Sequence, residues 1–147
     1  MKTAIATSLS VLMLAGCATG RLSSAERLEI YRAHAGPPQQ DLQYFGSLNG
    51  WTQLGDSALA VWTRPSEAYL LELRGPCDGL SFAPAIGLTS QMGRVSARFD
   101  KVLVRDTGGG PRVPCFINNI RKLDVPALRA SEKERRTAEM AEREAVS

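Results

Sequence analysis

The stretch that decides the fold is residues 58–73, ALAVWTRPSEAYLLEL, in which two β-type segments flank a turn. Residues 58–63 (ALAVWT) and 68–73 (AYLLEL) are rich in aliphatic, β-branched and aromatic side chains, which are typical of strands. Residues 64–67 (RPSE) predict a turn, because proline presets the backbone angle that a turn needs. The second segment is apolar on both faces, which predicts a central position in a sheet.

Shorter β-type segments lie on both sides of this stretch. Residues 49–50 (NG) predict a hairpin between residues 44–48 and 51–54, because Asn-Gly favours tight turns with positive φ. Further strands are expected at residues 85–89, 95–104 and 115–120. The apolar alternation changes phase at residues 100–101, which predicts a bulge or a break there. The expected fold class is therefore mainly β (α+β): a small antiparallel sheet, barrel or sandwich of roughly six or seven short strands.

Two helices are expected to flank the β domain. Ser23 and Glu26 have capping-box spacing, and apolar residues follow at helical period, which predicts an N-terminal helix over residues 23–35. Residues 124–126 (DVP) are typical of a helix start. The chain beyond them is rich in Glu, Lys, Arg and Ala, so we expect residues 126–147 to be a charged helical or disordered tail. A docking helix for a partner is the functional alternative.

The N-terminus has the features of an export signal. Lys2 supplies a positive charge, and residues 4–15 are an apolar stretch too short to span a bilayer. Residues 14–17 (LAGC) resemble the lipobox of bacterial lipoprotein precursors. The resemblance implies a diacylglyceryl thioether on Cys17, cleavage before Cys17, and acylation of the new amine, for example by palmitate. The alternatives are an ordinary signal with a chance cysteine, or a buried apolar helix.

An anchor at Cys17 would divide the chain into four parts. These are a signal peptide (1–16), a lipidated tether (17–22), a helix plus β domain (23–125) and the charged tail (126–147). Ala18, and not aspartate, follows the cysteine, which in enteric-type sorting implies the outer membrane. We therefore expect a protein on the periplasmic face of the outer membrane of a Gram-negative bacterium, with the membrane as partner through the acyl chains.

Two cysteines, Cys77 and Cys115, remain once Cys17 carries lipid. In an oxidising envelope such a pair is expected to form a disulfide. The closed loop of roughly forty residues would contribute about 4 kcal/mol in the chain-entropy model. Dithiol exchange is a weaker alternative without a Cys-x-x-Cys motif. Two cysteines with no histidine in the domain cannot complete the usual four-ligand zinc site.

Charge and motifs argue against several functions. The net charge is only +3 and the basic residues are dispersed, so no nucleic-acid partner is expected. His34, the only histidine, is interpreted as a cation at a helix C-terminus, with a general base as the alternative. The triple glycine at 108–110 lacks the lysine of a phosphate-binding loop. We expect no catalytic, metal-binding or cofactor-binding residues.

Four residues are candidates for a binding surface: Trp51, Trp62, Arg74 and Asp100. Exposed tryptophans beside a concave apolar surface would favour ligand binding. Both could instead pack in the core, and Arg74 and Asp100 could equally form a structural ion pair.

Five short motifs follow one another along the chain: Gly50-Trp51, residues 69–73 (YLLEL), Pro76-Cys77, residues 99–102 (FDKV) and Cys115-x-Ile117. Their order resembles that in a family of small proteobacterial lipoproteins, classed only as a domain of unknown function. The resemblance spans residues 25–125 together with the lipobox, and it implies no activity. We expect a non-enzymatic envelope module that binds a protein, lipid or cell-wall component. The alternatives are a small hydrolase-like periplasmic enzyme and a small-molecule or lipid binder.

Overall fold

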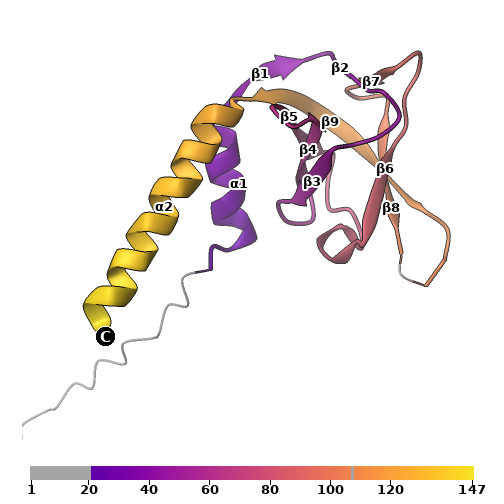
Figure 1. Ribbon diagram of the computed structural model, residues 1–147. Coiled ribbons are helices and arrows are strands. Elements are labelled where there is room, and N and C mark those ends of the chain that lie inside the picture. The colour runs from indigo at the N-terminus through magenta and orange to yellow at the C-terminus, as the bar shows by residue number, and fades with distance from the viewer. Residues whose placement is uncertain (1–20, 107) are drawn as a thin grey trace, which may run out of the picture.

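A curled antiparallel sheet with two helices beside it makes up the computed structural model, which describes residues 21–106 and 108–147 (Figure 1). The strands are β1 (Ala35–Gln39), β2 (Asp41–Gln43), β3 (Gly50–Gln53), β4 (Ala58–Arg64), β5 (Glu67–Leu73), β6 (Ala85–Leu88), β7 (Arg94–Ser96), β8 (Lys101–Arg105) and β9 (Val113–Leu123). The helices are α1 (Ser24–Ala33), the short 3₁₀ helix η1 (Leu80–Phe82) and α2 (Val125–Val146). The expectation of a mainly β, antiparallel fold is confirmed.

Seven strands form one sheet in the order β3-β4-β5-β9-β8-β6, with β1 also paired to β9. The remaining pair, β2 and β7, forms a separate two-stranded ribbon. The stretch 58–73 forms the β4–β5 hairpin, in which Leu59 lies opposite Leu71 and Ala60 opposite Leu70. Because β5 lies between β4 and β9, its predicted central position is confirmed.

The sheet buries apolar side chains on both of its faces. Successive residues of a strand point to opposite faces, so Leu70 and Leu71 join different cores. Leu71 belongs to the larger core, inside the curl of the sheet. Leu70 belongs to a second core on the outer face, together with Tyr31 of α1 and Leu128 of α2. The helices therefore cover the outer face over β4 and β5.

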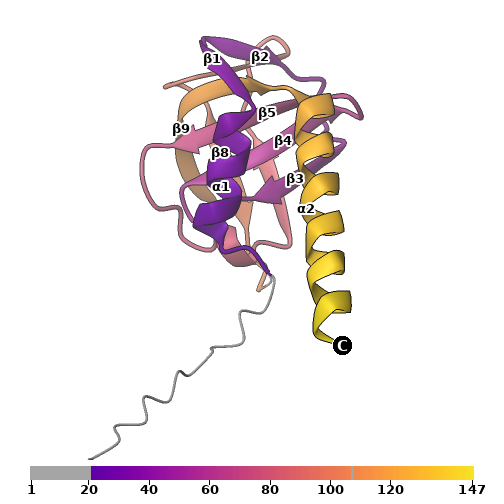
Figure 2. The same cartoon turned by 90° about the vertical axis from the view of Figure 1, so that its left-hand side faces the viewer.

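Both helices begin at a side-chain cap. The Ser23 hydroxyl accepts from the Glu26 N–H at 3.2 Å, and the Glu26 carboxylate accepts from the Ser23 N–H at 2.7 Å. The Asp124 carboxylate accepts from the Ala127 N–H at 3.1 Å. Residues 140–147 at the end of α2 are all exposed. The start of α1 and the end of α2 point toward the same end of the molecule in both views (Figures 1 and 2).

The hairpin predicted at residues 49–50 is wrong. Gly50 begins β3, which pairs with β4, and the Asn49 N–H donates to the Trp62 carbonyl at 2.8 Å. Residues 44–48 form no strand, and the preceding β2 pairs with the distant β7. Pairing with β4 places Trp51 against the inner core, so tertiary packing overrides the local turn preference.

Two strands were not foreseen, β1 and β2, which raises the described count to nine. Pro37 and Pro38 lie inside β1, just beyond the helix that was predicted over residues 23–35. Proline cannot donate to a ladder and is confined to edge strands or bulges. Accordingly β1 pairs only with β9, with a register shift between Ala35 and Pro38.

The expected disulfide is present. Cys77, four residues after the end of β5, is bonded to Cys115 of β9, with the two Cα atoms 5.8 Å apart. Cys77 is almost wholly buried in the inner core, and Cys115 packs at its margin. The bond thus ties the connection between β5 and β6 to the longest strand of the sheet.

Candidate functional site

The candidate site lies at a gap along one edge of β9, which at 11 residues is longer than either strand on that edge. One edge of β9 pairs with β5. On the other edge, β8 pairs with residues 113–116 and β1 pairs with residues 120–123. Residues 117–119 are left between the two partner strands, so the unequal strand lengths open the ladder there.

The chain between β7 and β8 crosses this gap and bonds to the free edge. The Arg98 N–H donates to the Ile117 carbonyl at 2.7 Å, and the Ile117 N–H donates to the Asp100 carbonyl at 3.1 Å. The Asp100 carboxylate is buried and accepts from the Ser96 N–H and the Thr89 hydroxyl, each at 2.7 Å. Asp100 therefore shapes the turn from inside and is not a surface contact.

Arg98 at the centre of this turn has a strained backbone. Its φ of 67° lies in the left-handed region, which costs a non-glycine residue about 1–2 kcal/mol. The Arg98 N–H is bonded to Ile117, and the Arg98 carbonyl accepts from the Arg74 guanidinium at 3.1 Å, so Arg74 holds the turn from outside. Backbone strain of this kind concentrates at binding and catalytic sites.

A polar cavity of about 600 Å³ opens beside Arg98. Its lining comes from the ends of β1 and β2, from the Arg98 turn and from the gap in β9: Pro38, Gln39, Gln40, Asp41, Ser96, Ala97, Arg98, Asn118 and Asn119. Asp41 is already paired with Arg94 at 3.0 Å. Within the described residues, the side chains of Gln40 and Asn118 make no hydrogen bond. The volume lies within the range of roughly 300–1,000 Å³ that is common for small-molecule sites.

A cluster of cations surrounds Phe116, two residues before the gap. The Arg74 guanidinium lies 5.2 Å and the Lys101 ammonium 4.9 Å from the centroid of the Phe116 ring. These are cation–π distances. The ring remains 41% exposed, so the cluster is open to solvent. None of Arg74, Arg98 and Lys101 forms an ion pair with any residue that the structure describes.

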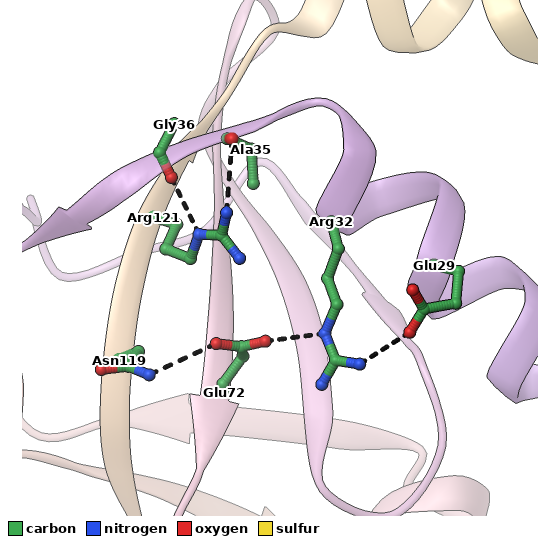
Figure 3. Close-up of polar contacts among 7 residues, drawn as sticks. All are labelled: Glu29, Arg32, Ala35, Gly36, Glu72, Asn119 and Arg121. Atoms are coloured by element: carbon green, nitrogen blue, oxygen red, sulfur yellow. Dashed lines mark hydrogen bonds and ion pairs between the residues drawn. The ribbon is translucent and has the colours of Figure 1, made fainter.

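A chain of polar contacts ties α1 to the cavity wall (Figure 3). Arg32 of α1 donates to the half-buried Glu72 of β5 at 2.9 Å and to Glu29 at 2.7 Å. Asn119 of β9 donates to the other Glu72 oxygen at 3.4 Å. The hydrogen bond to Glu72, and then that to Glu29, raises the pKa of Arg32. These contacts fix the side chain of Asn119, which is one of the residues that line the cavity.

Arg121 positions the wall that β1 contributes. Its guanidinium donates to the carbonyls of Gly36 at 2.8 Å and Ala35 at 3.5 Å, as Figure 3 shows. These two bonds lie where the register of β1 shifts, between Ala35 and Pro38. They hold Gln39, at the end of β1, over the gap in β9.

The four residues predicted as a binding surface do not form one surface. Trp51 packs on the inner core, whereas Trp62 packs on the outer one, with its ring edge-on to Tyr31 at 6.4 Å. Arg74 and Asp100 form no ion pair in the described part of the chain. Both instead support the Arg98 turn, Arg74 from outside and Asp100 from inside.

No signal in the sequence pointed to Arg98 or to the amides Gln39, Gln40, Asn118 and Asn119. The phase change predicted at residues 100–101 was the one signal near them, and the chain does break its β structure at 97–100. Nothing local indicated that β1 and β8 would pair with the same edge of β9 and leave a gap between them.

Other predicted features lie elsewhere. His34 is the C-cap of α1, with Nδ1 2.8 Å from the Ile30 carbonyl oxygen. Cys17 lies outside the described residues. Within residues 21–106 and 108–147, no helix is both long enough and apolar enough to span a membrane. No cluster of three or more potential metal ligands occurs in the same ranges.

Comparison with known families places the chain. The model of a family of unknown function, DUF6491, matches residues 1–139. The chain belongs to DUF6491. Neither a curated protein nor a solved structure matches it. Membership therefore runs from the N-terminal segment through most of α2, and it assigns no activity.

Proposed function

We propose that this DUF6491 member is a lipid-anchored cell-envelope protein whose β domain is a non-enzymatic binding module. The observation that carries the binding half is the polar cavity at the gap in β9, walled by amides and by the strained Arg98. The anchoring half rests on the lipobox ending at Cys17. Ala18 after the cysteine supports the periplasmic face of a Gram-negative outer membrane.

The arrangement of the chain suits an anchor at Cys17. Arg21, the first described residue, follows Cys17 by four positions, and four residues reach at most about 14 Å. The start of α1, the end of α2 and the β8–β9 turn all lie toward one end of the molecule (Figures 1 and 2). An anchor at Cys17 would therefore hold this end next to the lipid headgroups.

The cavity is suited to binding because most of its polar groups are hydrogen-bond donors and acceptors of the kind that bind ligands. The lining contains four side-chain amides, one hydroxyl, one carboxylate and one guanidinium. The carboxylate, Asp41, is already neutralised by Arg94. His34 lines a different hollow, beside Pro37 and Asp124. A cell-wall fragment, rich in hydroxyl and amide groups, matches this lining better than an apolar lipid chain does.

Anchoring is tested by expressing the full chain in a Gram-negative host with labelled palmitate, beside Cys17→Ser. We expect label in the membrane fraction from the wild type only. Mass spectrometry of the mature N-terminal peptide should find a diacylglyceryl thioether on Cys17. An unmodified Cys17, or cleavage at another bond, contradicts the anchor and leaves the binding half untouched.

Binding is tested with the detergent-purified full chain, labelled with ¹⁵N and titrated with solubilised cell-wall fragments. We expect saturable shifts of the backbone amides of residues 96–98 and 118–119, which line the cavity. Amides of residues 140–147, on the exposed end of α2, serve as the internal control and should not move. Shifts confined to other parts of the domain would contradict the site.

A further inference from the structure

The cavity and the cation cluster around Phe116 are parts of one surface. Arg98 links the cavity to the cluster, because Arg98 lines the cavity and its backbone carbonyl accepts a hydrogen bond from Arg74 of the cluster. Asn118 of the cavity follows Phe116 on β9 by two residues. A ligand in the cavity therefore lies against Arg98 and the free amides, while Arg74 and Lys101 lie next to the cavity, at Phe116.

Resting on the binding function proposed above, we propose that this site takes a hydroxylated ligand that carries a carboxylate or phosphate group. Arg98, Arg74 and Lys101 would hold the oxyanion, and the amides of Gln40 and Asn118 would hold hydroxyl or amide groups next to it. An acidic sugar, or an acidic unit of an envelope polymer, has this combination of groups.

The charges support an anion because the cations lack acidic partners. Each nearby carboxylate is engaged elsewhere: Asp41 with Arg94, Glu72 with Arg32, and Asp100 with Ser96 and Thr89 in the interior. Like charges held close together repel, and an anion relieves that repulsion. Guanidinium groups in particular present paired donors that match a carboxylate or phosphate.

The cations are also held in place before a ligand arrives. Arg74 is fixed by the Phe116 ring and by the Arg98 carbonyl, and Lys101 by the same ring. Long side chains that are already ordered lose less conformational entropy on binding. The Arg98 turn is itself fixed by its bonds to Ile117.

The amides support a ligand larger than a bare anion. The side-chain amides of Gln40 and Asn118 make no hydrogen bond among the described residues, whereas that of Asn119 is held by Glu72 and that of Gln39 by the Asp41 carbonyl. Each free amide offers two N–H donors and one acceptor oxygen. A cavity of about 600 Å³ leaves room for a sugar ring beside the oxyanion.

The test measures binding of four probes to the purified full chain by calorimetry: glucuronate, glucose 6-phosphate, glucose and inorganic phosphate. We expect glucuronate and glucose 6-phosphate, the two anionic sugars, to bind at least tenfold more tightly than glucose and than inorganic phosphate. Their affinity should fall as salt rises, because exposed charge pairs are screened. Equal affinity for glucose and the two anionic sugars would overturn the anion assignment, while the proposed binding function would still stand. Equal affinity for inorganic phosphate would overturn the role of the amides.

Variants locate the site. Arg98→Gln and Lys101→Gln should each weaken glucuronate binding at least fivefold, whereas Arg136→Gln, an exposed arginine on α2, should not change it. Asn118→Ala should weaken glucuronate and leave any inorganic phosphate binding unchanged. Circular dichroism confirms that each variant is folded. Affinities insensitive to both cation substitutions in folded protein would overturn the proposal.

Discussion

Cys77 is bonded to Cys115 across a sequence separation of 38, and the Cys77 N–H also donates to the Asp56 carbonyl at 2.7 Å. Cys77 thus connects the segment after β5 to β9 through the disulfide and to the β3–β4 turn through the hydrogen bond. The double variant Cys77→Ala/Cys115→Ala should lower the free energy of unfolding by about 4 kcal/mol in the chain-entropy model. Urea unfolding of both proteins on a Cys17→Ser background measures the difference. A loss under about 1 kcal/mol would contradict a structural role.

Local signals predicted the parts of the fold that local forces determine. The β4–β5 hairpin follows from proline and from two apolar runs next to each other, and β5 is central because both of its faces are apolar. The disulfide follows from the cysteine count once Cys17 is assigned to lipid. In each case the partners are close in sequence or the chemistry leaves few alternatives.

Long-range pairing accounts for what the sequence did not show. Asn49-Gly50 has a strong turn preference, yet β3 gains more from pairing with β4, which packs Trp51 against the inner core. The cavity depends on β1 and β8 sharing one edge of β9, although they are separated by more than sixty positions. Arg98 stands out by its left-handed backbone conformation, which depends on these distant contacts and has no local sequence signal.

The contact between Arg32 and Glu72 should stabilise the fold more than the contact between Arg32 and Glu29. The Glu72 side chain is 17% exposed and that of Glu29 is 69% exposed, so solvent screens the second pair far more. We expect Glu72→Gln to cost about 1–2 kcal/mol, because it leaves Arg32 and Asn119 poorly paired. The matched control Glu29→Gln should cost less than about 0.5 kcal/mol. Equal losses in urea unfolding would show that the difference in burial does not determine how much each contact stabilises the fold.

The positive φ of Arg98 predicts an unusual order of stabilities. Arg98→Gly and Arg98→Ala both remove the guanidinium, but only glycine relieves the left-handed backbone. The glycine variant should therefore be more stable than the alanine variant by about 1 kcal/mol. Both should lose glucuronate affinity to a similar extent. If alanine proves as stable as glycine in thermal unfolding, the turn carries no strain.

Alkaline pH should destabilise the domain through Tyr69. Burial, and then the hydrogen bond from its hydroxyl to Glu67 at 2.9 Å, raises the pKa of Tyr69 from 10.0 to about 12. The folded state thus disfavours the phenolate. The stability from this shift is fully present below pH 10 and is lost as pH rises toward about 12. Urea unfolding at pH 8 to pH 11.5 should show a steeper loss for the wild type than for Tyr69→Phe. Parallel curves would exclude Tyr69 as the cause.

Phe82 should meet the membrane if Cys17 carries the anchor. Its side chain is 91% exposed, and it lines a shallow hollow with Pro111 and Val113 beside the β8–β9 turn. That turn lies toward the end of the molecule where α1 starts (Figures 1 and 2). Arg105 and Asp106 border the same hollow, so the contact depends on apolar side chains more than on net charge. Exposed aromatic residues partition into the membrane interface.

The test compares Phe82→Cys with Met92→Cys, each labelled with a nitroxide on the lipidated chain in vesicles. Met92 is fully exposed as well, but it lies in the turn between β6 and β7, at the opposite end of the molecule (Figure 1). We expect the probe at position 82 to be shielded from an aqueous relaxation agent and the probe at 92 to stay accessible. Removing the anchor with Cys17→Ser should restore full access at 82. If 82 and 92 are equally accessible on a chain shown to be acylated, the anchored domain does not rest on this end.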